Sequence, residues 1–181
     1  MAITLNGTTG ITTPAISSTG SSTFTGSLAL PSGGLTVGTD QLAVDSSGRV
    51  TMPYQPYAAA SISSGTPSTG VVGFETGMSV SRGGLSVNNV SGRFTVPVAG
   101  AYLIGHYNLG NTGTGVCSCR IRVNGTAVTG GYTQDVNGSN DNFSQQTIVE
   151  LSASDYVDFD VMSGAFHNNQ NYSRFYICLL G

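Results

Sequence analysis

The chain contains the stretch Val116-Cys117-Ser118-Cys119-Arg120-Ile121-Arg122-Val123-Asn124-Gly125. Small or apolar residues alternate with polar ones as far as Val123, which is the period of a β-strand with one buried face. One face would hold Cys117, Cys119, Ile121 and Val123, and the other Arg120 and Arg122. Asn124-Gly125 then supplies the dipeptide most typical of a two-residue hairpin turn. The stretch predicts a strand that folds back into an antiparallel sheet.

Strand patterns recur on both sides of this hairpin. Residues 92–104 predict two strands around a Pro-to-Gly corner, and residues 146–151 and 155–161 predict an antiparallel pair joined by a short turn. In the second strand of that pair we expect Val157, Phe159 and Val161 to point inward, and Tyr156, Asp158 and Asp160 outward. The closing segment 172–180 places Phe175, Ile177 and Leu179 on one face. Because no long window shows the 3.6-residue period of a helix, the sequence predicts an all-β jelly-roll β-sandwich.

Residues 1–57 differ in composition and sequence pattern from the rest of the chain. Gly, Ser and Thr dominate, and short apolar units recur: Leu28-Ala29-Leu30, Leu35-Thr36-Val37, Leu42-Ala43-Val44 and Val50-Thr51-Met52. One chain is too thin here to bury these units, whereas three copies wound about an axis could cover one another. The pattern predicts an extended, β-rich trimeric stalk over residues 24–52, with a flexible linker as the alternative. Residues 1–23 would be an anchor that orders on docking, and residues 58–181 a separate head.

Composition narrows the range of partners. Charged residues make up only 8% of the 181 residues, and the net charge is −3. The six basic residues are scattered arginines, so no basic stripe exists for nucleic acid or for anionic membranes. No run of eighteen apolar residues predicts a membrane-spanning helix, and the start of the chain has no signal-peptide pattern. We therefore expect neither a nucleic-acid partner nor membrane insertion.

Catalytic patterns are sparse. His106 and His167 are the only histidines, and no Gly-x-Ser-x-Gly elbow accompanies them, so neither enzymatic activity nor a cofactor is expected. The three cysteines lack Cys-x-x-Cys spacing. Cys117, Cys119 and Cys178 are therefore expected to be small buried side chains in a reducing compartment.

Two sets of polar residues are candidate sites. Asp158 and Asp160 share a strand face, and two interpretations stay open: a solvated outer surface, or a calcium site that uses both carboxylates. The loops over residues 108–115, 129–143 and 163–172 are rich in Asn, Gly and Tyr, and loops on a rigid scaffold often carry recognition. The best candidates for a receptor contact are His167, Asn168, Asn169 and Tyr172.

Four segments of the head, in the same order, resemble the complement C1q globular head, a relative of the tumour-necrosis-factor jelly roll. The family pattern of a Phe, five residues and Gly-x-Tyr is present as Phe94, Gly100 and Tyr102, with Ile104 replacing a further Phe and His106 at the last aromatic position. The other segments are residues 122–125, 149–157 and 173–180. In the second of these a serine replaces the family glycine, and the family spacings upstream of residue 92 are not reproduced.

This resemblance implies a ten-stranded jelly roll that forms a tight homotrimer about its last strand and the neighbours of that strand. Aromatic Phe175 and Tyr176 alternate there, and aromatic side chains on both faces need cover on both faces, which a partner subunit can provide. We expect a trimer interface of Phe175, Tyr176, Ile177, Tyr102 and Phe159. The resemblance also permits calcium near the trimer axis.

Residues 3–14 and 45–56 resemble the attachment regions of bacteriophage tail or head fibres. A collagen stalk would need Gly at every third position, and that period is missing. The resemblance implies a virion protein, assembled in the cytoplasm of the host cell, whose residues 1–23 contact other virion proteins. The leading expectation is a homotrimeric, non-enzymatic fibre on the tail or capsid, with its head exposed to a host-surface glycan or protein. The alternatives are a capsid-decorating fibre without a receptor, an exported bacterial adhesive protein and a fibre depolymerase.

Overall fold

The computed structural model describes residues 36–37, 42–44, 47, 50–52, 54–62, 69–76, 79–111, 115–134, 141–167 and 171–180. All regular elements in these segments are β-strands. The described residues therefore contain no long apolar helix of the kind that crosses a membrane. The expected all-β class is therefore confirmed. The first three strands, β1 (Thr36–Val37), β2 (Leu42–Val44) and β3 (Val50–Thr51), form a small antiparallel sheet in the order β1-β2-β3. They coincide with three of the four predicted apolar units, and the fourth, together with residues 1–23, lies outside the described residues.

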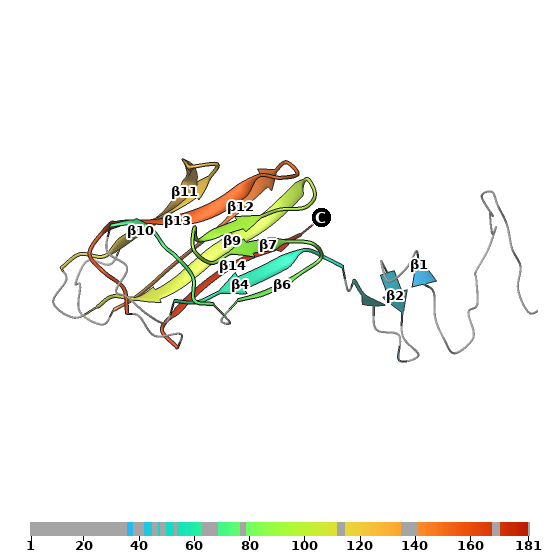
Figure 1. Cartoon of the computed structure of the whole chain (residues 1–181), viewed down its shortest axis with the longest axis horizontal. Coiled ribbons are helices and arrows are strands. Elements are labelled where there is room, and N and C mark those ends of the chain that lie inside the picture. Colours follow the sequence, from blue (N-terminus) through green and yellow to red (C-terminus); the bar gives the residue numbers. More distant parts are fainter. Residues whose placement is uncertain are drawn as a thin grey trace, which may run out of the picture.

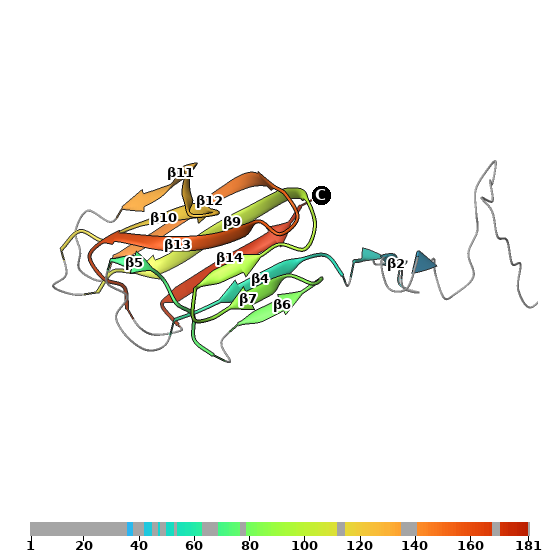
Figure 2. The ribbon, with the colours of Figure 1, turned by 45° about the horizontal axis from the view of Figure 1, so that its top comes forward.

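The head consists of two antiparallel sheets packed face to face (Figures 1 and 2). The five-stranded sheet has the order β12-β9-β14-β4-β6, with bounds β12 (Asn142–Leu151), β9 (Gly100–Leu109), β14 (Ser173–Leu179), β4 (Tyr57–Ala60) and β6 (Val80–Arg82). The six-stranded sheet has the order β11-β10-β13-β8-β7, and β5 also pairs with β13. Its bounds are β11 (Thr126–Gln134), β10 (Ser118–Val123), β13 (Tyr156–Ser163), β8 (Arg93–Thr95), β7 (Ser86–Asn88) and β5 (Gly70–Val71). The predicted jelly-roll sandwich is confirmed.

The predicted hairpin lies between β10 and β11. Asn124 and Gly125 both have positive φ, 51° and 79°, as the two central residues of a type I′ turn require. On β10, Cys119 and Ile121 are fully buried, as the alternation predicted. Ser118 is buried as well, because the register between β10 and β13 shifts between Ser118 and Cys119.

The predicted pairing of residues 146–151 with residues 155–161 is wrong. Strand β12 pairs with β9 in the five-stranded sheet, while β13 pairs with β10, β8 and β5 in the other sheet. The connection between them is an arch that crosses from one sheet to the other. Backbone hydrogen bonds hold the arch to the opposite layer, because Ser154 N–H donates to Val96 O and Val96 N–H donates to Asp155 O, both at 2.9 Å. Residues 129–143 are also less of a loop than predicted, since β11 extends to Gln134 and β12 begins at Asn142.

Aromatic rings fill the space between the sheets. Phe159 and Phe175 come from opposite sheets, and their ring centroids lie 4.8 Å apart. Both side chains are fully buried, and burying a side chain of this size contributes roughly 1.5–3 kcal/mol. The predicted inward faces of β13 and β14 are confirmed by this packing.

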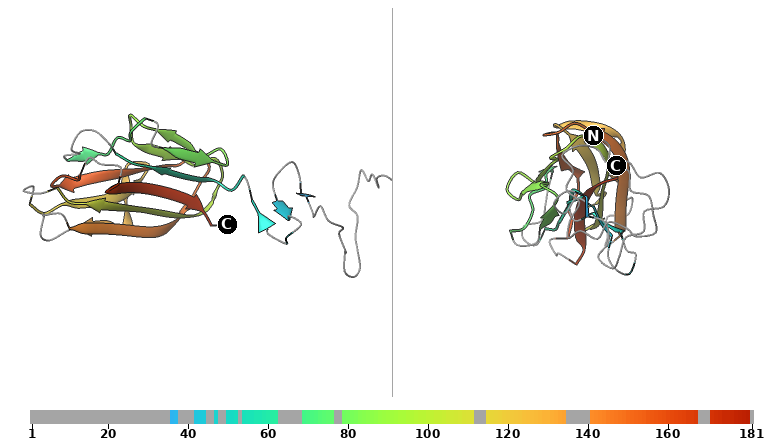
Figure 3. Two further views of the ribbon diagram at one scale, coloured as in Figure 1. Left: turned by 90° about the horizontal axis from the view of Figure 1, so that it is seen from below. Right: turned by 90° about the vertical axis from the view of Figure 1, so that its right-hand side faces the viewer.

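The two ends of the head are formed by different turns and strand ends. We call the base the end at which β4 begins and β14 finishes (Figure 3), and Leu180 lies there beside residues 54–56. The turns at Asn124-Gly125 and Ser152–Asp155 also lie at the base, because β10 and β12 run toward it. The tip is the opposite end, where β9, β11 and β13 finish and β12 and β14 begin.

Candidate assembly face and binding surfaces

The outward surface of the five-stranded sheet, which we call the assembly face, carries an apolar row from one strand to the next. The row joins Ile148 of β12, Leu103 of β9, Cys178 of β14 and Tyr57 of β4, each directly opposite the next in the pairing register. Ile148 is 62% exposed and Tyr57 37% exposed, while Leu103 and Cys178 are half-buried. Uncovered apolar surface of this kind across a sheet is typical of a contact with another molecule.

Tyr176 lies at the centre of the assembly face, beside that row. Its ring crosses Gly105 of the neighbouring strand, and a Cβ at Gly105 would lie 2.5 Å from Cζ of the tyrosine. The tyrosine hydroxyl donates a hydrogen bond to Oε1 of Gln146 at 3.3 Å. Burial raises the pKa of Tyr176 above its usual value of 10.0. A polar hollow of about 470 Å³ opens here between Tyr107, Tyr176 and the β12 side chains Ser144 and Gln146.

Four of the five residues predicted for the trimer interface lie elsewhere. Phe175, Tyr102 and Phe159 have no exposed surface and Ile177 has 1%, because these side chains point between the two sheets of their own chain. The closing strand alternates strictly, so Phe175 and Ile177 face the core while Tyr176 faces outward. The assignment of those four side chains to an interface is therefore wrong, and of the five only Tyr176 lies on the assembly face.

The outward surface of the six-stranded sheet carries a network of charges instead. Arg122 of β10 donates from Nε to Oδ1 of Asp158 at 2.6 Å, and Arg120 donates to Oδ2 of Asp160 at 2.7 Å. Arg93 of β8 approaches Asp158 at 3.8 Å and lies over the ring of Tyr156 at 4.1 Å. The hydrogen bond from Arg122 to Asp158 favours the charged guanidinium and raises the pKa of Arg122.

This network changes the interpretation of the two aspartates. Their side chains do leave the core face of β13 as predicted, but Asp158 is 0% exposed and Asp160 only 7%, so the first of the two interpretations, a solvated outer surface, is wrong. Guanidinium groups surround the carboxylates, and such an environment repels a divalent cation. Within the segments that the structure describes, no group of three or more His, Cys, Asp or Glu could hold a metal ion.

The predicted receptor-contact residues that can be located lie at the tip. His167 and Tyr172 face each other with ring centroids 5.4 Å apart, and Tyr172 is 42% exposed. Backbone hydrogen bonds from His167 N–H to Leu109 O and from Leu109 N–H to Tyr172 O fix this segment against β9. Asn168 and Asn169 lie outside the described residues.

No disulfide bond joins the three cysteines in the part of the chain that the structure describes. Cys117 and Cys119 are buried, as predicted, and burial strongly raises the pKa of Cys119. Cys178 was expected to be buried too, but it is only half-buried because its side chain faces outward on the assembly face; this partial burial raises its pKa as well. Thiols with raised pKa values stay protonated and react slowly as nucleophiles.

His106 lies in the aromatic core, a position that sequence reasoning did not assign. The alternation of β9, continued past Ile104, places it inward with no exposed surface, and its ring packs against Phe143, Phe159 and Phe175. Its Nδ1 lies 2.7 Å from Nδ2 of Asn108, so the neutral ring accepts a hydrogen bond from the amide. Its Nε2 is buried without a hydrogen-bond partner. Burial lowers the pKa of His106 from 6.5 to about 4.

This histidine predicts a loss of stability in acid. The unfolded chain takes up the proton near pH 6.5, whereas the folded chain resists it until about pH 4, so the free energy of unfolding falls as the pH drops between these values. At one pKa unit per 1.4 kcal/mol the loss totals about 3 kcal/mol. The variant His106→Phe should remove this part of the slope in urea denaturation at a series of pH values, while His167→Gln should keep it. An unchanged slope in His106→Phe would show that the buried ring does not control the acid response.

Comparisons with known proteins agree with this architecture. The C1q domain family model matches residues 58–178, which is well over half of the chain. The globular domain of zebrafish complement 1qA protein superposes with a TM-score of 0.53 over 70% of this chain and 98% of that one, at 16% identity, a likeness that concerns the fold alone. A search of curated proteins found no match. From residue 58 to residue 178, this chain is a member of the C1q domain family.

Proposed function

We propose that this protein is a non-enzymatic, homotrimeric fibre subunit of a bacteriophage particle. Its N-terminal residues would dock on the tail or capsid, and its head would be exposed for binding to the host surface. C1q domains are generally non-enzymatic, typically form trimers and bind ligands, which supports the assembly and binding parts of this proposal. The fibre and virion parts rest on the short strand-forming units before residue 52 and on the resemblance of residues 3–14 and 45–56 to phage fibres.

One observation carries the assembly part: the two outward surfaces of the sandwich differ. The outward surface of the six-stranded sheet is crossed by ion pairs, with single exposed apolar side chains such as Met162 among them. The five-stranded sheet instead carries a continuous apolar row from Ile148 to Tyr57. Apolar area gains about 25 cal/mol per Å² when it is removed from water, so the continuous row gives the assembly face a driving force for association, whereas covering the other face would also remove ion pairs from water.

The geometry of this row fits cyclic assembly. In a ring of three copies, each copy must use two different patches, because the contact runs from head to tail. Rotation about an axis parallel to the strands preserves height along that axis. Ile148 at the β12 edge and Tyr57 toward the opposite edge stand at the same height, since the pairing register joins them through Leu103 and Cys178. Ile148 of one copy can therefore meet the Tyr57 end of the row on the next copy.

The docking part predicts a separation of folding from incorporation. In a chain that lacks residues 1–23, the head should fold normally, because its core residues all lie beyond residue 57. Particles purified from cells that produce this shortened chain should lack it, whereas particles made with the full chain should contain it in an immunoblot. Circular dichroism of the two purified chains supplies the control for folding. Particles that carry both chains in equal amounts would refute docking through residues 1–23, and particles without either chain would refute the virion assignment.

A further inference from the structure

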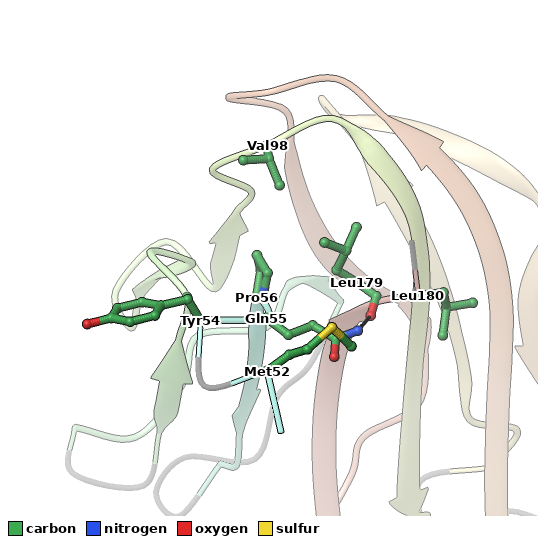
Figure 4. Close-up of a pocket in the computed structure, with 8 residues that line it drawn as sticks. Met52, Tyr54, Gln55, Pro56, Val98, Leu179 and Leu180 are labelled. Carbon is green, nitrogen blue, oxygen red and sulfur yellow. Dashed lines mark hydrogen bonds between the residues drawn. The ribbon is translucent and has the colours of Figure 1, made fainter. Parts of the chain in front are cut away.

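The chain enters the head through residues 54–56, which we call the strap, and hydrogen bonds join the strap to the end of the last strand, β14 (Figure 4). Gln55 donates from Nε2 to Leu179 O at 2.5 Å, and Leu179 N–H donates to Pro56 O at 2.8 Å. A third hydrogen bond, from Gln55 N–H to Met52 O at 3.0 Å, closes a turn before the strap. The entry of the head is thus joined directly to the end of its last strand.

A glycine in the turn between β6 and β7 makes room for the strap. Gly83 has a φ of +62°, and a Cβ at this position would lie 2.5 Å from Pro56 N and closer still to Tyr54 O. Any other residue would have to push the strap away from the turn. The next residue, Gly84, also has a positive φ, +77°, but a Cβ there would meet only the side chain of Pro97 at an ordinary 3.4 Å. The close approach of the strap is therefore specific to Gly83.

The burial of Pro56 supports the same contact. A hollow of about 440 Å³ lies between the strap and the end of β14, lined by Met52, Tyr54, Val98 and Leu180. Pro56 is buried and Gln55 is half-buried against the head. On the far side, Met52 follows β3 immediately, so that the strap is the short connection between β3 and β4.

We propose that the strap is a rigid junction that fixes the orientation of the head relative to β3, and that Gly83 is the residue that permits it. A tether without such contacts would let the head swing about several backbone bonds. Here two hydrogen bonds, a turn and buried Pro56 restrict those bonds. The strap and Leu179 lie just outside the residues that the C1q family model matches, whereas Gly83 lies within them. The proposal uses contacts within one chain and does not depend on the trimer.

Amide hydrogen exchange on the full chain tests this inference, because two adjacent amides report on different contacts. The Leu179 amide donates to Pro56 O of the strap, whereas the Leu180 amide donates to Ala101 O of β9. In the native protein both should exchange slowly. In Gly83→Ala the Leu179 amide should exchange about tenfold faster or more, with Leu180 nearly unchanged. In the matched control Gly84→Ala, which imposes a similar backbone strain without touching the strap, both amides should keep their protection.

A second variant guards against a general effect on folding. Gln55→Ala removes the side-chain bond to Leu179 without changing the turn, and it should also accelerate exchange at Leu179 more than at Leu180. The inference fails if the Leu179 amide of the native protein exchanges as fast as an unstructured one. It also fails if Gly83→Ala and Gly84→Ala affect Leu179 equally, or if Leu179 and Leu180 respond together in all variants.

Discussion

Replacing Ile148 with aspartate is expected to convert the proposed trimer into folded single chains. The side chain is 62% exposed in one chain, so an aspartate there costs the isolated head little. In the proposed assembly the same carboxylate would be buried against the row on the next copy, without a cationic partner. An unpaired charge at an interface costs about 2–5 kcal/mol, and a ring of three copies carries that cost at each of its contacts. Sedimentation velocity at matched concentrations measures the change.

The matched control is Met162→Asp. Met162 is 43% exposed on β13 and lies on the outward surface of the other sheet, so that it tests the same kind of substitution outside the assembly face. This variant should sediment like the native protein. If Ile148→Asp also sediments like the native protein, the apolar row is not the contact between copies.

Replacing Asp158 with alanine is expected to lower the free energy of unfolding by about 3–5 kcal/mol, the usual cost of removing one partner of a buried ion pair. Asp158 has no exposed surface, and the side chain of Arg122 is only 17% exposed, so the variant leaves a guanidinium without its main partner. Urea denaturation at one fixed protein concentration gives the difference, since stability depends on concentration in an oligomer.

A double substitution separates the charge from the packing. In Asp158→Leu combined with Arg122→Met, no unpaired charge is left between these positions, and most of the lost stability should return. A double variant as unstable as Asp158→Ala alone would mean that the loss comes from altered packing. A loss under about 1 kcal/mol in Asp158→Ala would mean that the pair behaves like an exposed salt bridge.

The sequence pattern was a reliable guide to which face of a strand a residue occupies. Alternation along β10, β13 and β14 predicted the side chains that face the core, and Asn124-Gly125 predicted the hairpin. These predictions succeed because the direction of a side chain on a strand is decided locally, by the period of two.

Which strands become neighbours was harder to predict. A connection of a few residues can close a hairpin or cross between two sheets, and local sequence does not distinguish the two. At residues 152–155 the choice depends on hydrogen bonds to Val96, which is remote in sequence. The same limit explains the interface error, because the sequence placed Phe175 on an aromatic strand without showing that Phe159 of the other sheet covers it.

Two further features, the ion pairs of the six-stranded sheet and the burial of His106, could have been predicted from the sequence. Arg120 and Arg122 alternate on one strand as Asp158 and Asp160 do on another, and such complementary pairs at i and i+2 predict cross-strand pairing. Continuing the alternation of β9 past Ile104 would have placed His106 in the core. The path of the strap, in contrast, could not be predicted from the sequence. It depends on the space that a glycine leaves at position 83 and on a contact between residues 55 and 179, which are remote in sequence.

Sedimentation equilibrium of the full-length native chain tests the central claim most directly. The claim is that the bare apolar surface of the five-stranded sheet is covered by neighbouring copies. It predicts a mass about three times the 18.5 kDa of one chain, constant over a wide concentration range. A mass of 18.5 kDa at every concentration would contradict the account.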